Sequence, residues 1–325
     1  MNLAEQFETL DIPVGAEGKI FNGEAIPEYP NFRIAVDIEG YPVLLFPTPP
    51  ATFKTPKNFK LRYLQLMQNV GCRITENNNV SFGNFSVVTF TSIEPFLQSY
   101  FLKIAETFVK SLSSQPSTEE IADTLNKFIE IFQSLSDAPT KTIQGLWAEL
   151  LLIDSCPQTE TLLSFWHNSP DDKFDFNSGY ERIEVKSSSN FERKHSFSSE
   201  QLNPPNGTNI IVASTLVRND AKGKNIQDLV YSISSKVSEI ELIEKFNSIV
   251  CKTLGTSLEQ AFIIKYDYDF SVNALKFYHY ADIAKIGEQD IPNDVTNVRF
   301  TSNLSNINSV NVANLPNKGI LFSSL

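Results

Sequence analysis

The sequence has few cysteines and few basic residues. Cys72, Cys156 and Cys251 are the only cysteines in 325 residues, with no Cys-x-x-Cys spacing and no histidine at zinc-ligand distance. A disulfide framework is therefore excluded, and we expect buried, reduced thiols. Lys and Arg number 27 against 38 Asp and Glu, so the net charge is -11. This excludes nucleic-acid binding through a broadly basic surface, and any such contact must be local or helped by a partner.

Long apolar runs and nucleotide-binding loops are also missing. No run approaches the ~20 apolar residues that a membrane span needs, and the first residues, MNLAEQFETL, lack the order of a signal peptide. No Walker-type loop or Gly-x-Ser-x-Gly motif is present. We expect a cytoplasmic protein that does not bind membranes and has no ATPase or acyl-transfer machinery of its own.

The residues that are present can fill a substantial core, since the chain is 41% hydrophobic and has 25 Phe. Residues 1–93 alternate in the manner of strands over 61–67 and 82–90, with turn residues at Asn77, Asn78 and Asn79. We therefore predict a β-rich N-terminal domain over residues 1–93. A second domain over 94–325 would combine a helical segment with an α/β core.

The second domain begins with sequence patterns that are typical of helices. Pro95 suits the first turn of a helix whose apolar spacing continues to Leu112, and a capping box at Ser117 opens a helix to about Leu135. A third helix begins near Thr140. Further along, the patterns predict strands at 209–216, 261–266 and 275–280 and a helix over 226–250. The tail after Val295 shows no clear pattern.

The segment FDFNSGYERIEVKSSS predicts two strands around an Asn-Ser-Gly turn. Residues two apart in a strand share a face, so Glu184 and Lys186 point the same way, while Ile183 and Val185 point into the core. Such pairs are common on strand surfaces, where they contribute roughly 0.2–1 kcal/mol without any function. A site therefore needs further acidic residues nearby.

Two such residues precede this strand. Asp175 lies between Phe174 and Phe176, where a buried carboxylate is costly unless it is paired or bound to metal. Glu149 lies in the apolar run of the preceding helix and is directed toward the same hairpin. Mg²⁺ prefers oxygen ligands, of which proteins supply one or two carboxylates. Asp175, Glu184 and the backbone carbonyl of Val185 fit that need, and Mn²⁺ is the alternative ion.

The order of helix-Glu, strand-Asp, hairpin, Glu-x-Lys, strand and helix resembles the PD-(D/E)XK nuclease superfamily. The stretches GLWAELLLI, KFDF, ERIEVKSSS and RKHSFSSEQL look more narrowly like the bacterial proteins described as "PD-(D/E)XK motif protein". The resemblance implies a restriction-endonuclease-like core, in which a mixed sheet is flanked by helices. It also implies gene clusters for defence or restriction-modification, with an ATPase or a DNA methyltransferase as partner.

The resemblance implies roles for individual residues. Asp175 and Glu184 would bind metal, Lys186 would assist catalysis, and Glu149 would support the metal or its water. The sequence departs from the motif because Phe174, and not Pro, precedes Asp175. A literal Pro-Asp occurs at Pro170 and Asp171, followed by Asp172, and these acids remain alternatives to Asp175.

A short basic segment follows the hairpin. Arg193, Lys194 and His195 concentrate potential cations in an otherwise acidic chain, and we expect local phosphate contacts there, with a solvated loop as the alternative. Gln201, in a short helix that Ser198 could cap, would either read a base or fix a backbone group.

The residues together with the resemblance therefore imply an Mg²⁺-dependent DNA endonuclease of a bacterial antiviral or restriction-like system. DNA and a partner protein would be its ligands, and a homo-oligomer is possible. One alternative is a catalytically silent nuclease fold that serves as a scaffold or DNA-binding subunit. The other is a nuclease that acts on RNA or on modified DNA, which the same site chemistry permits.

Overall fold

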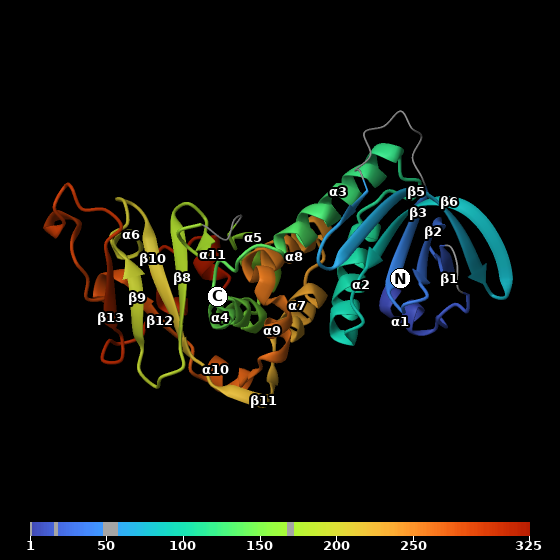
Figure 1. Cartoon of the computed structure of the whole chain (residues 1–325). Coiled ribbons are helices and arrows are strands. Elements are labelled where there is room, and N and C mark those ends of the chain that lie inside the picture. Colours follow the sequence, from blue (N-terminus) through green and yellow to red (C-terminus); the bar gives the residue numbers. More distant parts are fainter. Residues whose placement is uncertain (1, 16–18, 48–57, 168–171) are drawn as a thin grey trace. The chain divides into compact units, whose positions relative to one another are not determined.

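The computed structural model describes residues 2–15, 19–47, 58–167 and 172–325. Contacts divide the chain into two compact units, Met1–Ala138 and Pro139–Leu325 (Figure 1). Both units contain helices and sheets, whereas the sequence predicts a mainly β first domain over residues 1–93. None of the described helices is long and apolar enough to cross a membrane.

The first unit is built on a six-stranded sheet. Its elements are α1 (Leu3–Glu8), β1 (Ile20–Ile26), β2 (Tyr29–Val36), β3 (Pro42–Pro47), β4 (Phe59–Lys60), β5 (Leu64–Glu76), β6 (Asn79–Phe90), α2 (Pro95–Lys110) and α3 (Thr118–Ser134). The strand order is β1-β2-β3-β6-β5-β4. Because β1 also pairs in parallel with β5, the sheet closes on itself around apolar side chains. Asn77 and Asn78 take positive φ angles in the β5–β6 turn, where the sequence predicts a turn.

The boundary between the units lies after α2 and α3, not before them. Phe90 of β6 stacks on Phe101 of α2 with ring centroids 4.8 Å apart, and it meets Phe132 of α3 at 5.7 Å. These two helices therefore share a core with the N-terminal sheet. The sequence pattern placed the boundary at 93/94 because it registered the change from strand to helix and could not register this packing.

The second unit is centred on the helix α4 (Ile143–Ser155) and a four-stranded sheet. Its other main elements are α5 (Thr159–Ser164), β7 (Phe176–Asn177), β8 (Glu181–Ser188), β9 (Lys194–Ser198), α6 (Ser199–Leu202), β10 (Asn209–Leu216), β11 (Asn219–Lys224), α7 (Ile226–Ser235), α8 (Ile240–Leu254), α9 (Leu258–Ile263), α10 (Tyr268–Asn273), β12 (Lys276–His279), β13 (Arg299–Asn303) and α11 (Ile320–Ser323). The strand order is β12-β10-β8-β7, with β8 and β10 parallel and the outer pairs antiparallel. The sheet is therefore mixed, as the resemblance implies.

Packing on the two faces of this sheet defines its layers. The helix α4 runs beside β8 (Figure 1), and its residues Leu146–Asp154 are all buried. A ribbon of β9 and β13 covers the other face, where Phe197, Leu202, Val212 and Tyr278 share an apolar cluster. Residues 299–303 form strand β13 of this ribbon, in the tail to which the sequence patterns assigned no structure.

Two predicted elements of this unit are wrong. The helix expected over 226–250 is two helices, and between them Glu160 accepts hydrogen bonds from the backbone N–H groups of Ser238 and Glu239. The first half of the strand expected over 261–266 belongs to α9 (Leu258–Ile263), where Ala261 and Phe262 are buried. A short apolar run of this kind does not distinguish a buried strand from a buried helix.

Candidate active site

The predicted acidic residues come from three neighbouring elements of the second unit. Glu149 lies on α4, Asp175 immediately before β7, and Glu184 on β8. The Asn177-Ser178-Gly179 turn has Gly179 at φ 85° and returns the chain to β8, which confirms the hairpin. All three carboxylates are buried. The predicted acids are therefore brought to one edge of the sheet.

Glu149 is held by two aromatic donors. Its Oε2 accepts a hydrogen bond from Trp166 Nε1 at 3.0 Å and lies 3.3 Å from His167 Nε2. Its Oε1 lies 2.7 Å from the ammonium of Lys141. Burial alone would raise the pKa of Glu149, but the Lys141 charge and the His167 hydrogen bond lower it to about 2. Glu149 is therefore a fixed, ionised carboxylate.

Asp175 is tied to the same lysine and to the edge of the sheet. Its Oδ1 lies 2.6 Å from Lys141 Nζ, and its Oδ2 accepts a hydrogen bond from the Val185 N–H at 2.7 Å. The backbone carbonyl of Asp175 accepts from the His167 N–H at 3.0 Å. Burial and the Glu149 charge raise the pKa of Asp175, despite the opposing effect of Lys141. A second cation at this carboxylate would favour its charged form.

Glu184 and Lys186 share one face of β8, as predicted. Lys186 Nζ lies 2.6 Å from Glu184 Oε1 and 5.3 Å from the centroid of the Phe197 ring. Burial and the nearby Asp175 charge raise the pKa of Glu184 to about 8, although Lys186 opposes this. The second oxygen, Glu184 Oε2, is buried and has no hydrogen-bond partner in the part of the chain that the structure describes. An unpartnered buried carboxylate oxygen is costly and suits a cation.

This donor set fits a divalent metal ion in its chemistry, because hard carboxylate oxygens are the ligands that Mg²⁺ and Mn²⁺ prefer. Among the described residues, however, no group of three or more His, Cys, Asp or Glu side chains surrounds a common ion position. Lys141 Nζ stands between Glu149 and Asp175 instead. Because Lys141 occupies this position, the carboxylates of Glu149, Asp175 and Glu184 do not converge on one ion position as expected. The role of the Val185 carbonyl stays a prediction.

Arg193 and His195 lie in the interior. Arg193 donates to the carbonyl and hydroxyl oxygens of Ser214 and to the carbonyl of Ala274. His195 Nε2 lies 2.8 Å from Ser214 Oγ, and burial together with the nearby Lys186 and Arg193 charges lowers the pKa of His195 to about 4. These placements differ from the expected phosphate contacts, because Arg193 donates to Ser214 of β10 and to Ala274, and His195 of β9 also contacts Ser214.

Lys194 and Gln201 have different surroundings. Lys194 is exposed and lies 2.5 Å from Glu192, so it is available at the surface. Gln201 accepts a hydrogen bond from the Ser198 N–H at 3.1 Å and donates to the Lys173 carbonyl at 3.2 Å. Of the two roles expected for Gln201, this placement corresponds to fixing the backbone. Pro170 and Asp171 lie outside the described residues, and Asp172 is exposed.

The residues that sequence reasoning missed are Lys141 and Trp166, which fix the carboxylates. Lys141 stands eight positions before Glu149 and far from Asp175 in sequence, so no periodicity signals the contact. The only hint was the burial of Glu149 in an apolar helix, which requires a donor or a cation. His167 also lies against Glu149.

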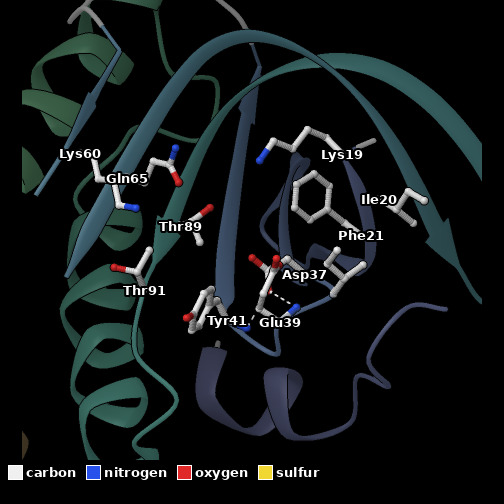
Figure 2. Close-up of a pocket in the computed structure, with 11 residues that line it drawn as sticks. Lys19, Ile20, Phe21, Asp37, Glu39, Tyr41, Lys60, Gln65, Thr89 and Thr91 are labelled. Atoms are coloured by element: carbon white, nitrogen blue, oxygen red, sulfur yellow. Dashed lines mark hydrogen bonds between the residues drawn. The ribbon is translucent and has the colours of Figure 1, made fainter. Parts of the chain in front are cut away.

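A separate cavity of about 440 Å³ lies in the first unit (Figure 2). Asp37 stands in its wall, where its Oδ1 accepts from the backbone N–H of Tyr41 at 2.8 Å and of Glu39 at 3.1 Å. Burial raises the pKa of Asp37. The remaining polar lining consists of Lys19, Glu39, Tyr41, Lys60, Gln65, Thr89 and Thr91. This lining suits a small polar ligand more than an apolar one.

The mixed sheet, the buried helix beside it and the acid-lysine cluster at its edge together define a nuclease-like α/β domain of the PD-(D/E)XK type. A family model described as "Putative PD-(D/E)XK family member, (DUF4420)" matches residues 3–305, and the chain belongs to this family. No curated protein and no solved structure matches it.

Proposed function

We propose that the chain is a divalent-metal-dependent nuclease that hydrolyses DNA phosphodiesters as part of a bacterial defence or restriction-like system. The observation that carries the proposal is the unpartnered Glu184 Oε2, buried next to Asp175 and beside the Lys186 ammonium. A buried acid with a raised pKa and a specific charge partner is typical of functional sites. Family membership supports a nuclease-like fold.

Each residue of the acidic cluster has a separate role in the proposed reaction. Asp175 and Glu184 would hold Mg²⁺ or Mn²⁺, and Glu149, fixed by Trp166, would support the same ion. When bound, the ion would withdraw charge from a phosphoryl oxygen and make an attacking water more acidic. Lys186 is held over the Phe197 ring, so its positive charge is ready to stabilise the negative charge that develops on the phosphate.

The chain's net negative charge supports the proposal that a partner protein delivers the nucleic acid. The net charge is -11, and the buried Arg193 already donates to backbone and hydroxyl oxygens of the protein. An ATPase or a DNA methyltransferase of the same gene cluster is the partner that we propose. The first unit would serve recognition or assembly, with the polar cavity around Asp37 as its ligand site.

The proposal is tested by incubating supercoiled plasmid with the chain and Mg²⁺. We expect nicking that EDTA abolishes and that Lys186→Ala reduces at least about 100-fold. Lys252→Ala removes an exposed lysine of the same unit and is the matched control, which should retain activity. Equal nicking by Lys186→Ala would contradict the proposed site. Plasmid binding without cleavage would indicate the silent nuclease fold, and methylated DNA and RNA substrates separate the remaining alternatives.

A further inference from the structure

Lys141 is a second amine in the acidic cluster, and its position differs from that of Lys186. It lies in the bend that precedes α4, where the Thr142 side chain accepts from the Gly145 N–H and caps the helix. The Lys141 side chain is 21% exposed, whereas those of Glu149 and Asp175 are 4% and 8% exposed. Lys141 therefore reaches its two buried partners from the solvent side.

The contacts of Lys141 decide which carboxylate oxygens are open. Its Nζ lies 2.7 Å from Glu149 Oε1 and 2.6 Å from Asp175 Oδ1, and the opposite oxygen of each carboxylate already accepts protein hydrogen bonds. With Lys141 in place, Glu184 Oε2 is the single oxygen of the cluster without a partner among the described residues. If Lys141 swings outward, one oxygen from each of three carboxylates becomes open.

Charge balance favours such an exchange. When all three carboxyl groups are ionised, they exceed the two ammonium groups of Lys141 and Lys186 by one negative charge. A divalent ion in the place of Lys141 would neutralise it. Lys186 cannot leave as easily, because it projects from β8 and packs over the Phe197 ring. Lys141 is attached to a bend, and its side chain can turn into water without disturbing a strand or helix.

We propose that Lys141 is an internal counter-cation that a divalent metal ion displaces, so that metal binding and the Lys141 ion pairs exclude one another. This inference rests on the proposed function, because it assumes that the same carboxylates bind metal. It assigns to Lys141 a positioning role: it holds Glu149 and Asp175 together until the ion enters. It also makes the metal affinity of the site depend on a residue that is not a ligand.

The variant Lys141→Met tests the proposal, since it removes the charge and keeps an apolar stem of similar length. We expect it to bind Mn²⁺, followed by electron paramagnetic resonance of the free ion, at least about tenfold more tightly than the unaltered chain. Lys141→Arg retains the charge and should bind no more tightly than the unaltered chain. Lys194→Met is the matched surface control and should leave Mn²⁺ affinity unchanged.

A measurement on the unaltered chain avoids any dependence on the folding of a variant. Reductive methylation followed by mass spectrometry reports how accessible each lysine amine is. Saturating Ca²⁺, which occupies oxygen sites, should increase the methylation rate of Lys141 several-fold and leave that of Lys194 unchanged. Unchanged methylation of Lys141 with bound Ca²⁺ would overturn the displacement.

The outcomes separate this inference from the proposed function. If the unaltered chain binds Mn²⁺ and nicks plasmid, but Lys141→Met binds Mn²⁺ equally or more weakly, the inference fails and the nuclease proposal stands. If the unaltered chain neither binds Mn²⁺ nor nicks plasmid, both fail.

Discussion

The stability of the second unit should depend on pH through Glu184. Its pKa is raised from 4.5 to about 8, first by burial and then by the Asp175 charge. A carboxyl group with a raised pKa contributes stability that is fully present below about 4.5 and is lost as the pH rises through about 8. Glu184→Gln keeps the shape of the side chain and removes this titration.

The size of the effect follows from the two pKa values. One pKa unit corresponds to about 1.4 kcal/mol, so the change from 4.5 to about 8 corresponds to on the order of 5 kcal/mol. Relative to Glu184→Gln, the unaltered chain should lose up to this free energy of unfolding between about pH 5 and pH 8. Bound Mg²⁺ should reduce the loss, because a cation favours the carboxylate.

Urea denaturation followed by tryptophan fluorescence measures the free energy of unfolding of the second unit. The chain has 2 Trp, Trp147 and Trp166, and both are buried in the second unit. The experiment compares the unaltered chain, Glu184→Gln and the exposed control Glu192→Gln in EDTA from pH 5 to 9. A difference between the unaltered chain and Glu184→Gln that does not change with pH would refute the raised pKa and the burial argument behind it.

Three further predictions follow from buried groups. Trp166→Phe removes the donor to Glu149 Oε2 and should lower the free energy of unfolding by about 1–3 kcal/mol, measured by circular dichroism; an unchanged value would contradict the contact. Arg193→Met should lower the free energy of unfolding in urea by on the order of 2–4 kcal/mol. It should leave the dependence of DNA affinity on salt concentration unchanged; a weaker dependence on salt in the variant would show that Arg193 contacts phosphate. The three cysteines are buried, and burial raises the pKa of Cys72 to about 11, so native protein should not react with a thiol reagent at pH 8 until it is unfolded.

Sequence patterns predicted the elements that carry local signals. The capping box at Ser117, the helix beginning at Pro95 and the Asn-Ser-Gly turn each depend on neighbouring residues, and all three are confirmed. The same holds for Glu184 and Lys186, whose shared face follows from strand geometry alone. These features needed no knowledge of tertiary packing.

Long-range packing accounts for what could not be predicted. Lys141 meets Asp175 across 34 positions, and Arg193 meets Ser214 across 21, so neither contact has a local pattern. A basic residue after a hairpin is as compatible with a buried hydrogen-bond donor as with a phosphate contact. The closed sheet of the first unit likewise depends on the pairing of β1 with β5, which are distant in sequence.

The central claim is that Asp175 and Glu184 hold a divalent ion, and anomalous diffraction from crystals soaked in Mn²⁺ tests it most directly. We predict a peak within about 2.5 Å of Glu184 Oε2 and an Asp175 oxygen, with Lys141 turned away from both partners. Crystals of Glu184→Gln should lack that peak. A chain saturated with Mn²⁺ whose anomalous peaks all lie elsewhere, with Lys141 still between Glu149 and Asp175, would contradict the claim.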